Sequence, residues 1–182
     1  MTKSPKKINR FGPADVALTG VFCAVWAVLN RTLGPFSVAV LGVPVLHDFA
    51  VFFTLLVAVW ATGKAGVASL VGVIGSLLAL ALGMPLVVLG FTAGAFVFDA
   101  VLIVSHHKIA LNIGSIAVAI VATLASAYFA GVLIGLFILS MPVFWVLSVW
   151  AGWHLVGGIF TVAVTLPVIG MLEKANVRVI RT

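Results

Sequence analysis

Charged residues are scarce in this sequence, and acidic ones are the scarcest. Of 182 residues only 8% are charged, with four Asp and Glu together, while 64% are hydrophobic. Soluble domains carry about 25% charged residues. A water-soluble fold of this size could not bury so much apolar surface. We therefore expect most of the chain to be surrounded by lipid, as an integral membrane protein.

Cysteine and the common catalytic motifs are also nearly absent. Cys23 is the only cysteine, which excludes an internal disulfide and any Cys-based zinc spacing. The sequence has no G-x-S-x-G and no H-E-x-x-H, and its Gly-Lys stretch at residues 62–66 lacks the form of a phosphate-binding loop. We expect no catalytic residues, no metal and no cofactor, and hence no enzyme.

Acids that could relay protons inside the membrane are few as well. Only Asp15, Asp48 and Asp99 fall at or within the expected membrane spans. Proton-coupled pumps usually depend on intramembrane ionisable groups. If this chain moves a solute uphill, we expect the energy to enter through a partner.

What the sequence does contain is a series of apolar runs long enough to cross a bilayer. Turn residues divide them, which predicts an all-α, six-helix transmembrane bundle. Gly34-Pro35 is expected to end the first helix, and a broken loop against the outer face should follow to residue 46. The end of the fifth run is expected to form an outer loop before Met141-Pro142. The predicted spans cover about residues 14–33, 47–62, 65–82, 86–105, 110–139 and 143–172.

The distribution of Lys and Arg predicts the orientation of this bundle. With six spans and the N-terminus inside, nine basic residues lie on the cytoplasmic side and Arg31 alone lies outside, which agrees with the positive-inside rule. We predict a multi-pass protein of the cell membrane with cytoplasmic tails at 1–12 and 175–182 around a transmembrane domain at 13–174. The net charge of +6 then needs no nucleic-acid partner. The nine residues are Lys3, Lys6, Lys7, Arg10, Lys64, Lys108, Lys174, Arg178 and Arg181.

Small residues recur at a spacing of four along several spans, which allows helix backbones to approach closely in lipid. This pattern suits either packing inside the bundle or a docking face for another membrane subunit. The first span is the best candidate for docking because it carries two overlapping pairs, Gly20 with Ala24 and Cys23 with Ala27. The other sets are Gly75, Ala79 and Gly83; Gly90 and Gly94; and Gly131 and Gly135.

Polar residues flank the predicted outer loop after the first span. Asn30 and Arg31 end that span, and His47 and Asp48 begin the next. Arg31 and Asp48 can form an interfacial ion pair that holds the loop. The alternative is that all four residues form a rim that faces a ligand.

Asp99 is the acid predicted to lie deepest, in the inner half of the fourth span. It can contact the cytoplasmic turn at residues 106–108, or it can serve as a buried counter-charge for a cationic ligand group.

Aromatic and imidazole side chains meet in the middle of the last span. Trp150 and His154 are four residues apart on one helical face, with Trp153 beside them. A ring and an imidazole at this depth suit a flat heteroaromatic ligand, through stacking and a hydrogen bond. Ordinary packing explains them equally well. Tyr128 in the fifth span is a weaker candidate for the same site.

The sequence resembles the substrate-binding S components of energy-coupling factor (ECF) vitamin transporters. The likeness covers nearly the whole chain, as a pattern of glycines and helix lengths. It lies in Val28-Leu29-Asn30-Arg31 followed by a broken loop, in the glycine-spaced stretch Gly63 to Gly83, and in Gly152 to Lys174 with Gly157-Gly158 inside. Spans two to four are closest to the hydroxymethylpyrimidine/thiamine type, which has a glutamate near the position of Asp99.

This resemblance implies a six-helix subunit that holds a small vitamin or precursor near the outer face. Such subunits work with a transmembrane coupling subunit and two cytosolic ATPases. In the family, small residues of the first helix in an A-x-x-x-A pattern contact the coupling subunit. That pattern is absent here, and Gly20, Cys23, Ala24 and Ala27 would stand in for it. The alternatives are a stand-alone secondary carrier or channel and a membrane scaffold without a ligand.

Overall fold

The computed structural model describes residues 11–175 and 177. The predicted tails therefore lie almost entirely outside the described residues, and so do their basic residues Lys3, Lys6, Lys7, Arg10, Arg178 and Arg181. Within the described part the chain forms helices and no strand, which confirms the all-α prediction. Six helical rods span Pro13–Leu41, Val45–Thr62, Val67–Ala81, Val88–Ser105, Ile113–Ile138 and Val143–Lys174.

Five of the six rods are long and apolar enough to cross a membrane, and the exception is α3 (Val67–Ala81). Its 15 residues span about 22 Å at 1.5 Å per residue, against a hydrocarbon core of about 30 Å. The other α-helices are α1 (Pro13–Phe36), α2 (Val45–Thr62), α4 (Val88–Val101), α5 (Ile113–Leu133), α6 (Val143–Trp145) and α7 (Ala151–Lys174). Wider or tighter turns extend them as η1 (Ser37–Leu41), η2 (Leu102–Ser105), η3 (Ile134–Ile138) and η4 (Val146–Trp150).

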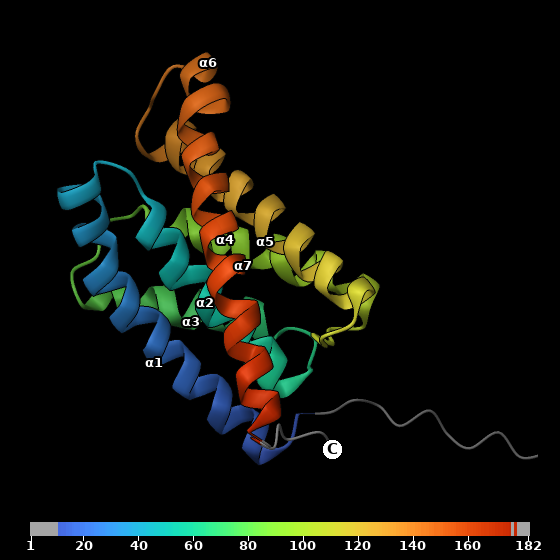
Figure 1. The fold of residues 1–182 in the computed structure, drawn as a ribbon. Coiled ribbons are helices and arrows are strands. Elements are labelled where there is room, and N and C mark those ends of the chain that lie inside the picture. The colour runs from blue at the N-terminus through green and yellow to red at the C-terminus, as the bar shows by residue number, and fades with distance from the viewer. Residues whose placement is uncertain (1–10, 176, 178–182) are drawn as a thin grey trace, which may run out of the picture.

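Helix α2 forms the centre of the bundle. It packs against α1 on one side and α7 on the other, while α3, α4 and α5 complete the surrounding layer from α1 to α7. In its most apolar stretch 67% of residues are buried, against 28% for α1 and α7. Figure 1 shows the start of α1 and the end of α7 at the same end of the molecule, with α6 at the opposite end.

The first helix does not end at Gly34-Pro35, and this prediction was wrong. Pro35 lies inside α1, and the rod continues through the π-helical turn η1 to Leu41. The break comes at Gly42, which adopts a left-handed φ of 69°. Lipid offers no hydrogen bonds to a broken backbone. A wide helical turn after the proline, which keeps its backbone hydrogen bonds, is therefore more stable there than an apolar loop. The fifth rod likewise stays helical to Ile138, and only a short link precedes α6.

The small residues of α3, α4 and α5 pack inside the bundle. A Cβ atom added at Gly75 would lie 2.6 Å from the Trp26 ring, and one at Gly90 would lie 2.3 Å from Ile134. At Gly94 it would lie 3.1 Å from the backbone oxygen of Ser126. These glycines let neighbouring helices approach closely, which supports the packing interpretation for them.

On α1 the predicted docking residues divide between two faces. Cys23 and Ala27 are each only 2% exposed, and Cys23 Sγ lies 3.9 Å from the Leu70 oxygen of α3. Gly20 and Ala24 are exposed on the outer face. Only Gly20 and Ala24 are therefore available to another subunit.

Buried polar contacts join the helix ends near the two termini. The Asp15 carboxylate caps α1 by accepting a 2.8 Å hydrogen bond from the Gly12 N–H, and it lies 3.6 Å from Lys64 Nζ after α2. Trp60 Nε1 of α2 donates to Glu173 Oε1 of α7 at 3.1 Å. These contacts tie α1, α2 and α7 together at one end of the bundle.

Candidate ligand-binding site in the helix bundle

A carboxylate and an imidazole meet in the interior of the bundle. Asp48 lies in the first turn of α2 and His154 near the start of α7, and His154 Nδ1 is 2.8 Å from Asp48 Oδ1. Their side chains are 0% and 1% exposed. With an ionised carboxylate as acceptor, Nδ1 carries a hydrogen and Nε2 is directed elsewhere.

Aromatic rings from three helices surround this pair. The Phe91 ring of α4 lies between the two imidazoles, 4.5 Å from His47 and 5.6 Å from His154 between ring centroids. The Trp150 ring meets His154 edge-on at 5.4 Å. We call His47, Asp48, Phe91, Trp150 and His154 the buried cluster.

Glycines stand opposite the polar members of the buried cluster. A Cβ atom would lie 3.2 Å from the His47 ring if added at Gly34, and 2.6 Å from the His154 ring if added at Gly131. At Gly157 it would lie 2.5 Å from Asp48 Oδ2. At Gly131 and Gly157 an added side chain would force the facing polar side chain to move, whereas at Gly34 a shift of a few tenths of an ångström would suffice.

Four polar atoms of the buried cluster have no hydrogen-bonding partner within the described residues. They are His47 Nε2, Asp48 Oδ2, Trp150 Nε1 and His154 Nε2. Buried polar groups in proteins are nearly always hydrogen-bonded, and each one left without a partner costs about 1–3 kcal/mol. The buried cluster thus combines unpartnered donors and acceptors with aromatic rings in the interior of the bundle.

The predicted pair of Arg31 and Asp48 does not form. Arg31 is exposed at the surface, where its Nε donates to the Leu82 oxygen at 3.0 Å, whereas Asp48 faces inward to α7. Asn30 is 0% exposed, and its Nδ2 donates to the Trp26 oxygen at 2.8 Å while its Oδ1 has no partner among the described residues. Asp48 lies in the interior of the bundle and not at its surface, so its partner is His154 of α7 and not Arg31.

Asp99 lies apart from the buried cluster, at the start of α3. Its carboxylate accepts hydrogen bonds from the Gly66 N–H at 3.2 Å and from the Ser69 hydroxyl at 2.7 Å. His107 Nε2 lies 3.1 Å from Asp99 Oδ1. Asp99 thus caps the N-terminus of α3 from α4. It also contacts the turn at residues 106–108, which was the first of the two alternatives predicted for it.

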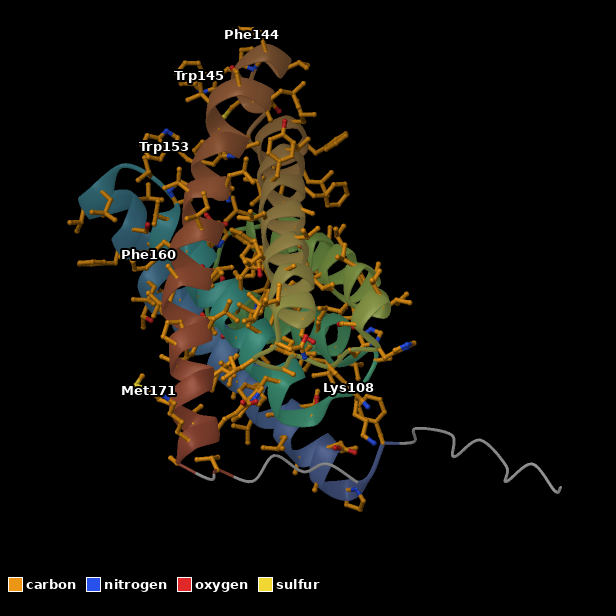
Figure 2. The ribbon with its side chains drawn as sticks, turned by 45° about the vertical axis from the view of Figure 1, so that its right-hand side comes forward. Lys108, Phe144, Trp145, Trp153, Phe160 and Met171 are labelled. Carbon is orange, nitrogen blue, oxygen red and sulfur yellow. The ribbon has the colours of Figure 1, made fainter. Side chains whose placement is uncertain are left out.

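Two other predicted ligand residues lie outside the buried cluster. Trp153 is 41% exposed, and Figure 2 shows it with Trp145 of α6 and Phe160 of α7 along the outer side of the last rod. Tyr128 is half-buried, and its hydroxyl donates to the Leu147 oxygen at 3.2 Å, which links α5 to η4.

Phe91 is the member of the buried cluster that sequence analysis missed. It is one of 13 phenylalanines, and it lies in an apolar run in which Thr92 is its only polar neighbour in sequence. Its position between two imidazoles depends on how α4 packs in the bundle, which no local pattern encodes.

Comparison with known proteins identifies the fold. No protein-family model and no curated protein sequence matches this chain. A solved structure described as the crystal structure of an S-component of ECF transporter matches with a TM-score of 0.65. The alignment has 17% sequence identity and covers 92% of this chain and 88% of the other. The chain is therefore a multi-pass membrane protein with the fold of an ECF-transporter S component.

Proposed function

We propose that this chain is the solute-binding membrane subunit of an ECF-type importer and that its ligand binds at the buried cluster. The observation that carries the proposal is the Asp48–His154 pair, set among aromatic rings with unpartnered polar atoms inside a bundle of S-component fold. The cost of keeping such groups inside a membrane protein favours a functional role for them.

The chemistry of the buried cluster suits a small, flat, water-soluble molecule. Phe91 and Trp150 offer ring faces and edges for stacking, and the free atoms of Asp48 and His154 offer hydrogen bonds. A vitamin or vitamin precursor fits this description. Thiamine and its pyrimidine precursor are the first compounds to test, because of the resemblance of spans two to four.

Energy for uptake would come from a coupling subunit in the membrane and two cytosolic ATPases. The exposed pair of Gly20 and Ala24 on α1 is the proposed contact with the coupling subunit, because small side chains allow a partner helix to approach closely. Cys23 and Ala27 would support this contact indirectly by holding α1 against α3. Both termini would lie in the cytoplasm.

Mass spectrometry of small molecules that remain bound after mild purification tests the ligand proposal most directly. A vitamin-like molecule retained by the wild type and lost from an Asp48→Ala variant is the expected result. Co-expression with a coupling subunit and its ATPases should yield a complex and ATP-dependent uptake. Gradient-driven uptake by the isolated chain in liposomes would instead indicate a stand-alone carrier or channel. A chain that retains nothing and binds no coupling module would be a scaffold.

A further inference from the structure

The buried cluster contains three titratable side chains, and the charged groups on the surrounding helices lie elsewhere. Asp48 and His154 form the pair, and His47 packs with them across Phe91. The remaining titratable groups of the packed helices lie at other places. On α1, Asp15 caps the helix start beside Lys64, Cys23 packs against α3 and Arg31 is at the surface. Asp99 of α4 lies at the start of α3, and Tyr128 of α5 contacts Leu147. On α7, Glu173 binds Trp60 near the end of the helix and Lys174 is exposed.

The carboxylate of Asp48 must be neutralised within this group. An isolated net charge is strongly disfavoured in a buried, apolar environment, and Asp48 is 0% exposed. With two neutral imidazoles and an ionised Asp48 the cluster would carry a net charge of −1. Without a ligand, one additional proton therefore makes the cluster neutral. The proton count is the same whether that proton resides on His154, on His47 or on Asp48 itself.

We propose that the ligand of this site carries a positive charge and that its binding releases this proton. This inference rests on the proposed function. The cationic group takes the place of the proton as the counter-charge of Asp48, so the cluster stays neutral with His154 as a neutral imidazole. The exchange is balanced: one cation enters, one proton leaves to solvent, and no covalent bond between heavy atoms changes. Oδ2 of Asp48 has no hydrogen-bonding partner among the described residues, and an ionised carboxylate oxygen is a strong acceptor for a cationic donor.

The proposal fixes how affinity depends on pH. Because one proton is released on binding, affinity rises about tenfold for each unit of pH over the range in which the empty site holds the proton. A neutral ligand would show no such slope. An anionic ligand would require proton uptake, and its affinity would fall as pH rises. The sign of the slope therefore reports the charge of the ligand.

The proton count of the wild-type protein can be measured without a ligand. With ¹⁵N-labelled histidine in lipid nanodiscs, ring-nitrogen NMR signals assigned by His47→Gln and His154→Gln report the state of each imidazole. Infrared difference spectra against Asp48→Asn report whether the carboxyl is protonated. At pH 7 we expect one imidazolium with a carboxylate, or neutral imidazoles with a carboxylic acid. Neutral imidazoles together with an ionised Asp48 would overturn the proposal.

An introduced lysine serves as a tethered cation that does not depend on ligand identity. Trp150 touches His154, so the ammonium of Trp150→Lys can reach the pair. We expect it to expel the proton, leaving neutral imidazoles and an ionised Asp48, while the neutral control Trp150→Met keeps the wild-type spectra. A folded Trp150→Lys variant that retains the proton would contradict the exchange. If this variant does not fold, the wild-type spectra still decide the proton count.

Thiamine is the soluble probe, because its thiazolium ring is a permanent cation. Calorimetry in buffers of different ionisation enthalpy should show about one proton released for each thiamine bound. Tight binding without proton release would sink the inference while leaving the proposed function in place. If thiamine does not bind but the spectra behave as expected, thiamine is excluded as the ligand and the proton exchange stands. Retention of an anionic or neutral molecule by the purified wild type would refute the charge assignment.

Discussion

Gly157 of α7 lies directly against Asp48 of α2, so close that a Cβ atom at position 157 would stand 2.5 Å from Asp48 Oδ2. The same carboxylate binds His154 through its other oxygen. The position of the Asp48 carboxylate thus depends on the absence of a side chain at Gly157, about one helical turn from His154.

Gly157→Ala is expected to displace Asp48 and to separate it from His154. Overpacking of this kind costs about 1–3 kcal/mol, and ligand retention should be lost. The matched control is Gly152→Ala in the same helix, where an added Cβ meets nothing within 4 Å. That change should be neutral or stabilise α7 by up to about 1 kcal/mol. Thermal unfolding in detergent and ligand retention measure both effects, and equal behaviour of the two variants would contradict the prediction.

Asp48→Ala is expected to destabilise the bundle by about 1–3 kcal/mol, because it leaves the neutral His154 imidazole buried without its hydrogen-bonding partner. The double variant Asp48→Leu with His154→Phe replaces both polar groups with apolar ones of similar volume. It should recover most of the stability but none of the ligand binding. Unfolding in detergent, combined with ligand retention, separates the two roles. Recovery of binding in the double variant would remove the pair from the site.

Asp99→Ala is expected to lower stability by about 2 kcal/mol, because α3 loses its cap and His107 loses its carboxylate partner. Ligand affinity should stay unchanged, since Asp99 lies outside the buried cluster. Ser69→Ala removes one of the hydrogen bonds to Asp99 and should cost about 1 kcal/mol. Weaker binding by an Asp99→Ala protein of unchanged stability would assign Asp99 to the ligand after all.

The predicted orientation can be tested by cysteine labelling at the two ends of the bundle. Lys108 and Phe144 are exposed and lie at opposite ends of the molecule, as Figure 2 shows. In a Cys23→Ser background, a reagent that does not cross membranes should label Phe144→Cys in intact cells. It should label Lys108→Cys only after the cells are opened. The reverse pattern would place both termini outside.

A bulky residue on the exposed face of α1 is expected to block assembly with a coupling subunit. Ala24→Trp fills the space beside Gly20 and should abolish co-purification at unchanged stability. Val121→Trp is the control, because Val121 is 57% exposed on α5, away from the proposed contact. If both variants assemble normally, the contact lies on another face of the bundle.

The local sequence encodes much of the fold, since hydrophobic runs, turn glycines and the distribution of charge are all local signals. The end of the first helix was predicted wrongly because proline usually breaks a helix in water. In lipid, a backbone that keeps its hydrogen bonds is favoured, and the helix continues past Pro35. The local sequence also indicated Trp150 and His154 as one face, and the structure brings their rings into contact.

Composition and periodicity alone determined that this chain is a bundle of apolar helices, because both report directly how each segment interacts with lipid. Only the tertiary structure decided which buried polar groups meet. Asp48 and His154 are 106 residues apart, and Phe91 between the imidazoles looks like any other apolar residue of its helix. Pairing across such distances depends on the close approach of α2, α4, α5 and α7 at their glycines, and no single segment carries that information.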